Sequence, residues 1–163
     1  MARSHRLAVE VEIREATAPD LRTLATWSGN VESVFRPAID MGRAVLLVAG
    51  AGGRFPIGHV LVDLQTRRSG SIGVISHLQV LGGFRDQGLG TALMEEAERR
   101  MREAGLTTAL LAVEKVNKPA ERLYKRRGYK RIGESVDRWP EAGPDGELRD
   151  VDHPSWVMQR KLP

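Results

Sequence analysis

The residues best placed for chemistry in this 163-residue sequence are two glycines, Gly88 and Gly90, at the start of its longest predicted helix. An apolar strand ending at Val80 precedes them. Backbone N–H groups in the first turn of a helix have no intrahelical partner and lie at the positive end of the helix dipole. Glycine lets a ligand come close to such groups because it has no Cβ atom. The segment therefore predicts a phosphate-binding loop, to which Arg85 could add a charged contact.

This loop differs from two common nucleotide-binding motifs. A Walker loop needs a lysine after its last glycine, and Thr91 follows Gly90 instead. A dinucleotide-binding fingerprint needs a third glycine, and Leu93 occupies that position. From the residues alone, the alternative stays open that the glycines only make a tight turn between a strand and a helix.

Two segments of the chain resemble the GNAT superfamily of acetyl-CoA-dependent N-acetyltransferases. The run RDQGLG, residues 85–90, matches the family's R/Q-x-x-G-x-G/A motif. Residues 117–129 resemble its N-x-x-A-x-x-L-Y-x-x-x-G-F segment, with Tyr129 in place of phenylalanine. Both segments stand in the family's order and at its usual separation. The specific part of the match covers residues 78–129.

The resemblance implies that the chain binds acetyl-CoA and holds its pyrophosphate with backbone amides of the glycine loop. By motif position these amides belong to Gln87, Gly88, Leu89, Gly90, Thr91 and Ala92. The strand end at Leu78 and Val80 would pair its backbone with the pantetheine arm, whose two amides suit an unpaired strand edge. Asn117 would hydrogen-bond the pantetheine or a water, or else cap the helix that begins near Pro119. No metal is implied.

The resemblance also implies a general acid. Acetyl transfer from a thioester to an amine releases a thiolate, which a nearby phenol can protonate. Tyr124 holds the motif position that often has this role in the family, and its alternative role is packing. The base is less defined, because strand alternation places His77 on the face opposite Leu78 and Val80. A bulge in this strand would change that alternation, so His77 is a base candidate, and its alternative role is that of a core or interface histidine. Direct attack with water relaying the proton needs no dedicated base.

The elements that position these residues follow from periodicity and turn signals. Strands are predicted at residues 10–16, 44–49, 56–64, 71–80, 107–113, 129–136 and 155–161. Helices are predicted after an N-cap at Thr17, at 31–41, from the glycine loop to 104, and at 119–127. The apolar strand 107–113 is expected to be buried on both faces. Residues 65–70 are expected to form a polar turn, and 141–153 a long polar loop.

This element order predicts a mixed α/β domain. The GNAT-like fold implied by the resemblance has a central, largely antiparallel sheet with splayed middle strands flanked by helices. We expect a single domain over residues 1–163, with residues 1–9 as a flexible N-terminal tail. The final strand could pair across a homodimer. The polar loop predicted at 141–153 carries five carboxylates, which either attract a cationic amine or are simply solvated. Trp139, close to this loop in the sequence, could line a pocket.

Composition excludes several classes of protein. The 25 basic and 21 acidic residues give a net charge of +4, but both signs are interspersed, which argues against a nucleic-acid partner. The absence of cysteine excludes disulfides, thiolate metal sites and cysteine nucleophiles. The N-terminus has no apolar signal-peptide stretch, and the apolar run 44–51 is too short to span a bilayer. We therefore expect a cytoplasmic protein without membrane or nucleic-acid partners.

The predicted function is N-acetyl transfer from acetyl-CoA to a primary amine of a small molecule or a peptide, by direct attack in a ternary complex. The alternative is a non-catalytic module that binds acyl-CoA and has the same fold. The sequence does not identify the amine.

Overall fold

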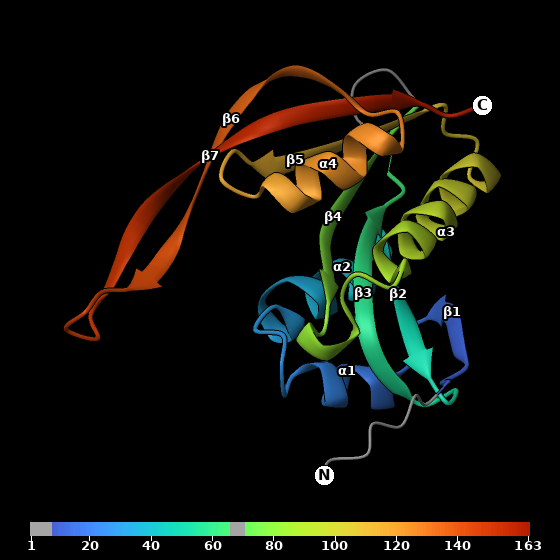
Figure 1. The fold of residues 1–163 in the computed structure, drawn as a ribbon, viewed down its shortest axis with the longest axis horizontal. Helices are drawn as coiled ribbons and strands as arrows, with labels where there is room; N and C mark the ends of the chain where they lie inside the picture. Colours follow the sequence, from blue (N-terminus) through green and yellow to red (C-terminus); the bar gives the residue numbers. More distant parts are fainter. Residues whose placement is uncertain (1–7, 66–70) are drawn as a thin grey trace, which may run out of the picture.

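A seven-stranded sheet in the order β1-β2-β3-β4-β5-β7-β6 organises the chain (Figure 1). The computed structural model describes residues 8–65 and 71–163. Its strands are β1 (Val11–Glu15), β2 (Ala44–Ala51), β3 (Phe55–Asp63), β4 (Ile72–Val80), β5 (Thr108–Glu114), β6 (Lys130–Ala142) and β7 (Leu148–Lys161). Its helices are α1 (Ala18–Leu24), α2 (Arg36–Asp40), α3 (Leu89–Glu103) and α4 (Lys118–Arg126), with a π-helical turn η1 (Val31–Phe35) and a 3-10 turn η2 (Gly82–Phe84).

The observed order of elements confirms the predicted mixed α/β fold. Most of the predicted tail and of the turn at 65–70 falls outside the described residues. Within the described residues, no helix is both long and apolar enough to cross a membrane.

The sheet opens between β4 and β5. All neighbouring strands are antiparallel except this pair, which is parallel. The pairing runs only from Ile72 opposite Thr108 to Val74 opposite Leu110. The rest of β4, residues 75–80, has no register partner in β5, while β5 pairs with β7 along its whole length. The middle strands are therefore splayed, as the resemblance implied.

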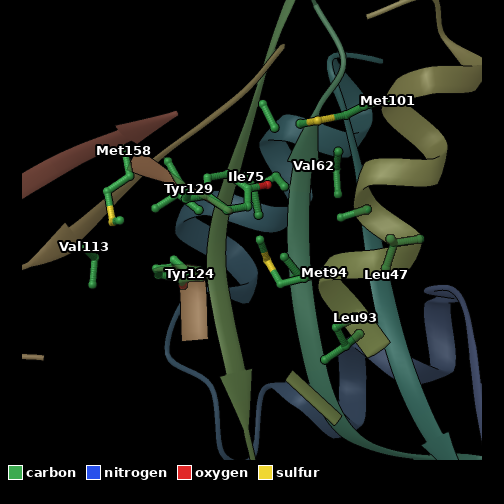
Figure 2. Close-up of a cluster of buried hydrophobic side chains, with 14 of the residues drawn as sticks. Leu47, Val62, Ile75, Leu93, Met94, Met101, Val113, Tyr124, Tyr129 and Met158 are labelled. Carbon is green, nitrogen blue, oxygen red and sulfur yellow. The ribbon is translucent and has the colours of Figure 1, made fainter. Parts of the chain in front are cut away.

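Helices cover both faces of the sheet because its central strands are apolar on both sides. In β2, Leu47 and Ala49 pack into the larger core with α3 and α4, whereas Leu46 and Val48 pack into a second core with α1, η1 and α2. Figure 2 shows the larger core, in which Met94 and Met101 reach from α3 toward β3. Burying such side chains stabilises the fold by about 1.5–3 kcal/mol each.

The prediction of a long polar loop at 141–153 is wrong. The strands β6 and β7 pair from Lys130 opposite Gln159 to Ala142 opposite Leu148, so only residues 143–147 form the turn. Cross-strand contacts compensate for the polar composition: Arg138 Nε donates to Asp152 Oδ1 at 2.6 Å, and the rings of Trp139 and His153 stack at 3.4 Å. The outer part of this hairpin forms an arm that projects from the body of the molecule (Figure 1).

Two further expectations change with this topology. The strand β5 is not buried on both faces, because Ala112 is exposed where the sheet opens. The final strand β7 lies between β5 and β6, so it has no free edge for pairing across a dimer. The free edge on that side of the sheet belongs to β6.

A buried carboxylate links α3 to the end of α4 and to β7. Glu98 is 1% exposed and accepts hydrogen bonds from Arg127 and Arg160, both at 2.7 Å, and from the Tyr129 hydroxyl at 3.0 Å. Its negative charge is tolerated in the core because these donors surround it. The network joins α3, the end of α4 and β7.

We expect Glu98→Ala to lower the free energy of unfolding by about 2–4 kcal/mol, because it leaves Arg160 and a buried phenol without their acceptor and removes one of the two acceptors of Arg127. Urea denaturation followed by circular dichroism measures this. Glu103→Ala is the matched control on the same helix, since the Glu103 side chain is 56% exposed, and we expect a change below about 0.5 kcal/mol. Equal losses in the two variants would contradict this role for Glu98.

Candidate active site

Two cavities adjoin each other where β4 and β5 part. One of about 450 Å³ lies between the end of β4, the glycine loop and the start of α4. The other, of about 610 Å³, lies between β4, β5 and the β6–β7 arm. Leu78, Asn117 and Ala120 line both. We call them the loop cavity and the arm cavity.

The loop cavity faces an uncapped helix N-terminus. Gly88 is the N-cap of α3, with φ 82°, in the left-handed conformation that favours glycine. No side chain caps the helix, and Ala92 N–H already donates to Gly88 O at 3.0 Å. The amides of Leu89, Gly90 and Thr91 therefore remain as donors for an anion. At Gly90 an added Cβ would meet Leu123 Cδ2 at 3.2 Å, so the glycine also permits close packing of α3 on α4.

Most of the predicted cofactor-binding residues lie together around the loop cavity. Its lining includes Leu78, Val80, Arg85, Gly88, Leu89, Gly90, Thr91 and Asn117. Gln87 and Ala92 are not part of this lining. The side chain of Arg85 folds back on the strand, where its Nε donates to Val80 O at 3.0 Å.

Asn117 has the capping role that the sequence left as an alternative. Its Oδ1 accepts the Ala120 N–H at 3.2 Å. Its amide NH₂ is the group left to donate to a ligand, and the residue lines both cavities. Capping and ligand binding are therefore compatible.

Arg126, in the basic cluster Lys125, Arg126 and Arg127 at the end of α4, also lines the loop cavity. Its neighbours are held elsewhere: Lys125 Nζ lies 2.9 Å from Glu121, and Arg127 binds Glu95 and Glu98. Within the described residues, Arg126 makes no ion pair, so it is the member of the basic cluster at the end of α4 that can meet a phosphate.

Tyr124 is one of the residues that line the arm cavity. It is 7% exposed and packs edge-on against Tyr129, with ring centroids 6.1 Å apart. Burial raises the pKa of Tyr124 to about 12, because the apolar surroundings penalise the phenolate. The phenol therefore keeps its proton at neutral pH and can donate it.

A bulge in β4 places His77 in the same cavity. Ser76 stands opposite Leu61 and Gln79 opposite His59, so His77 and Leu78 together face Val60. His77 has φ 54°, a left-handed conformation that is costly for a residue with a Cβ atom. The bulge breaks the simple alternation expected for this strand, and His77 and Leu78 both line the arm cavity. A hydrogen bond of 3.0 Å joins His77 Nδ1 and Ser76 Oγ.

A second histidine, His59, packs close to this region, and sequence reasoning missed it. It is fully buried, with its ring 5.3 Å from that of Trp27 and 5.0 Å from that of Phe35. Phe35 in turn packs edge-on against His77 at 5.6 Å. Neither ring nitrogen of His59 has a hydrogen-bond partner of normal geometry among the described residues. Burial lowers the pKa of His59 to about 4, so the ring is neutral at pH 7.

The β6–β7 arm forms the outer wall of the arm cavity. Asp137, Arg138 and Trp139 of β6 line it together with Ser155 of β7 and Glu114 of β5. The expectation that Trp139 could line a pocket agrees with this position. None of these lining residues belongs to the acidic segment 141–153, which sequence analysis interpreted as a loop, so the structure does not place its five carboxylates at the cavity.

The comparisons with known proteins agree on one family. The model of the acetyltransferase (GNAT) family matches residues 11–129. A GNAT-family acetyltransferase from Streptococcus pneumoniae is 21% identical, with 94% of this chain and 100% of that chain covered and a TM-score of 0.70. Arabidopsis thaliana NAA60 in complex with acetyl-CoA is 18% identical over 94% and 99%, with a TM-score of 0.74. Escherichia coli ribosomal-protein-S18-alanine N-acetyltransferase is 18% identical over 94% of each chain, with a TM-score of 0.70. Among curated protein sequences, none matches.

We expect His59 to make the fold less stable in acid. Its pKa is lower in the folded chain, about 4, than the ordinary 6.5. The unfolded chain therefore binds the extra proton first, and the contribution present above pH 6.5 is lost as the pH falls toward 4. The total loss is roughly 3 kcal/mol. Urea unfolding of the wild type and of His59→Leu at several pH values from 7 to 4 measures this loss. The free energy of unfolding should fall more steeply with decreasing pH in the wild type than in the variant. Parallel curves would contradict the prediction.

Proposed function

The chain belongs to the GNAT family of acetyltransferases, and from that premise we propose that it moves the acetyl group of acetyl-CoA to a primary amine of a small molecule or peptide. One observation carries this proposal. A helix N-terminus without a side-chain cap and a buried phenol lie on two adjoining cavities that meet at Leu78.

The described residues fit coenzyme A. Bound acetyl-CoA would supply an activated acetyl thioester. The amides of Leu89, Gly90 and Thr91 would bind its diphosphate, and Arg126 would add a positive charge for a phosphate. The unpaired end of β4 offers backbone groups to the two amides of the pantetheine arm. The NAA60 structure, which contains acetyl-CoA, supports this assignment.

Tyr124 is the proposed general acid. As the amine nitrogen bonds to the acetyl carbon and the carbon–sulfur bond breaks, the phenol gives its proton to the departing sulfur. Its raised pKa keeps the proton available until that step. The backbone N–H of Leu78, beside the bulge, would stabilise the negative charge that develops on the acetyl oxygen.

His77 is the proposed general base. It lines the same cavity as Tyr124, and burial lowers its pKa below the ordinary 6.5. The imidazole is therefore neutral at pH 7 and able to accept the proton that the attacking amine must lose. The hydrogen bond with Ser76 and the edge contact with Phe35 hold the ring in place.

We expect Tyr124→Phe to lower kcat about 100-fold or more, because the leaving thiolate loses its proton donor. Release of free thiol from acetyl-CoA across a panel of primary amines measures turnover. Isothermal titration calorimetry should show acetyl-CoA binding within about twofold of the wild type, since the phenol is not among the anion-binding groups.

The two readouts separate two failures. Wild-type turnover in Tyr124→Phe would contradict the acid role and leave the family function intact. A folded wild type that takes up no coenzyme A or acetyl-CoA would overturn the proposed function. Binding without transfer to any amine would favour the non-catalytic module.

We expect His77→Gln to lower kcat/KM for the amine at least 10-fold and to alter the pH profile. In the wild type, protonation of His77 should reduce kcat/KM at a pH below 6.5, because its pKa is lowered by burial. The variant should lack that decline at acidic pH. An unchanged profile would show that water, rather than His77, relays the proton.

A further inference from the structure

The arm cavity has an anionic and aromatic wall. Asp137 and Glu114 line it beside Trp139, which is 37% exposed. Asp137 makes no ion pair with any residue in 8–65 or 71–163. The charge of Arg138, which also lines the cavity, is compensated by Asp152 at 2.6 Å. The wall therefore carries negative charge that the described residues do not compensate.

A buried imidazole supports this wall through contacts with Trp139 and Glu114. His153, whose side chain is 9% exposed, stands opposite Asp137 in the β6–β7 ladder. Its Nδ1 is 3.4 Å from Glu114 Oε2, its Nε2 is 3.3 Å from Glu141 Oε1, and Trp139 stacks on its ring. Its Nε2 is buried but makes no hydrogen bond of normal geometry in the described part of the chain. The imidazole therefore lies between two carboxylates and holds the indole ring of Trp139 in the wall.

The reacting amine does not account for this wall. A nitrogen that attacks a thioester must be neutral, and nearby carboxylates would favour its protonated, unreactive form. The negative charge would help the reaction only if it binds a different, permanently cationic group of the same acceptor. Carboxylates next to an exposed indole face are a common arrangement for binding an organic cation.

We propose that the acceptor is a primary amine with a second cationic group, which Asp137 and Glu114 bind beside the ring of Trp139. This inference rests on the proposed function and specifies its substrate class. The second cation is either the distal ammonium of a diamine or a basic side chain near the N-terminus of a peptide. Both sources share the chemistry that the wall recognises.

Matched acceptors test the inference. We expect kcat/KM for 1,4-diaminobutane to exceed that for 4-aminobutan-1-ol, or kcat/KM for Ala-Arg-Gly to exceed that for Ala-Gln-Gly, by about 10-fold or more at low salt. The pair with the larger ratio identifies the source of the cation. Raising the salt concentration should reduce the ratio, because the wall is partly exposed.

Asp137→Asn should reduce that ratio about fivefold or more. Asp150→Asn is the control: it removes the same charge from the same arm, but Asp150 pairs with Pro140 rather than lining the cavity. We expect its ratio to stay within about twofold of the wild type. A ratio near one in the wild type for both pairs, or equal effects of the two variants, would overturn the inference.

Direct binding keeps the test independent of turnover. Calorimetry of the CoA-loaded protein should show 1,4-diaminobutane or Ala-Arg-Gly binding more weakly to Asp137→Asn than to the wild type and Asp150→Asn. No binding of either probe to the wild type would overturn the inference. Turnover of the neutral amines as fast as the cationic ones would overturn it too, while leaving the proposed acetyl transfer intact.

Discussion

The site depends on the short backbone pairing between β4 and β5. Their pairing stops at Val74 and Leu110, and everything assigned to function lies beyond that point. Gly73 helps to fix where the contact is made, because an added Cβ there would meet Met101 Cε at 2.8 Å and Leu106 Cδ1 at 2.7 Å. The backbone of β4 beyond the contact has lost a neighbouring strand, and unpaired backbone groups are costly away from water. A ligand with amides of its own can replace that missing strand.

Where a sheet opens between two strands, other contacts must keep those strands in place, and two features provide such contacts here. The strand β5 is paired with β7 along its full length, so it does not need β4 to stay in place. Glu98 then ties α3 to the end of α4 and to Arg160 of β7 through the same buried carboxylate. Since α3 carries the amides proposed to bind the diphosphate and α4 carries Tyr124, this network also fixes the two halves of the candidate site relative to each other.

The parts of the site that the sequence predicted depend on local chemistry. The glycine loop, the helix after it and the cap at Asn117 each follow from a few neighbouring residues. The β4 bulge at His77 depends on its register with β3, and the burial of His59 depends on Trp27 and Phe35 from a distant segment. Neither leaves a local signal. The arm was predicted to be a loop because its residues are polar, whereas cross-strand pairs such as Arg138 with Asp152 stabilise it as a hairpin.

Burial favours the neutral form of both proposed catalytic groups, which is the form that the reaction requires of each. Loss of water penalises whichever form is charged, so it raises the pKa of Tyr124 and lowers that of His77. The phenol therefore holds a proton and the imidazole lacks one before any substrate arrives. One transfer would reverse both states and leave a phenolate and an imidazolium in the same cavity, where each is disfavoured. Return of the proton from His77 to Tyr124 is then downhill, so the environment that prepares the pair also restores it after each turnover.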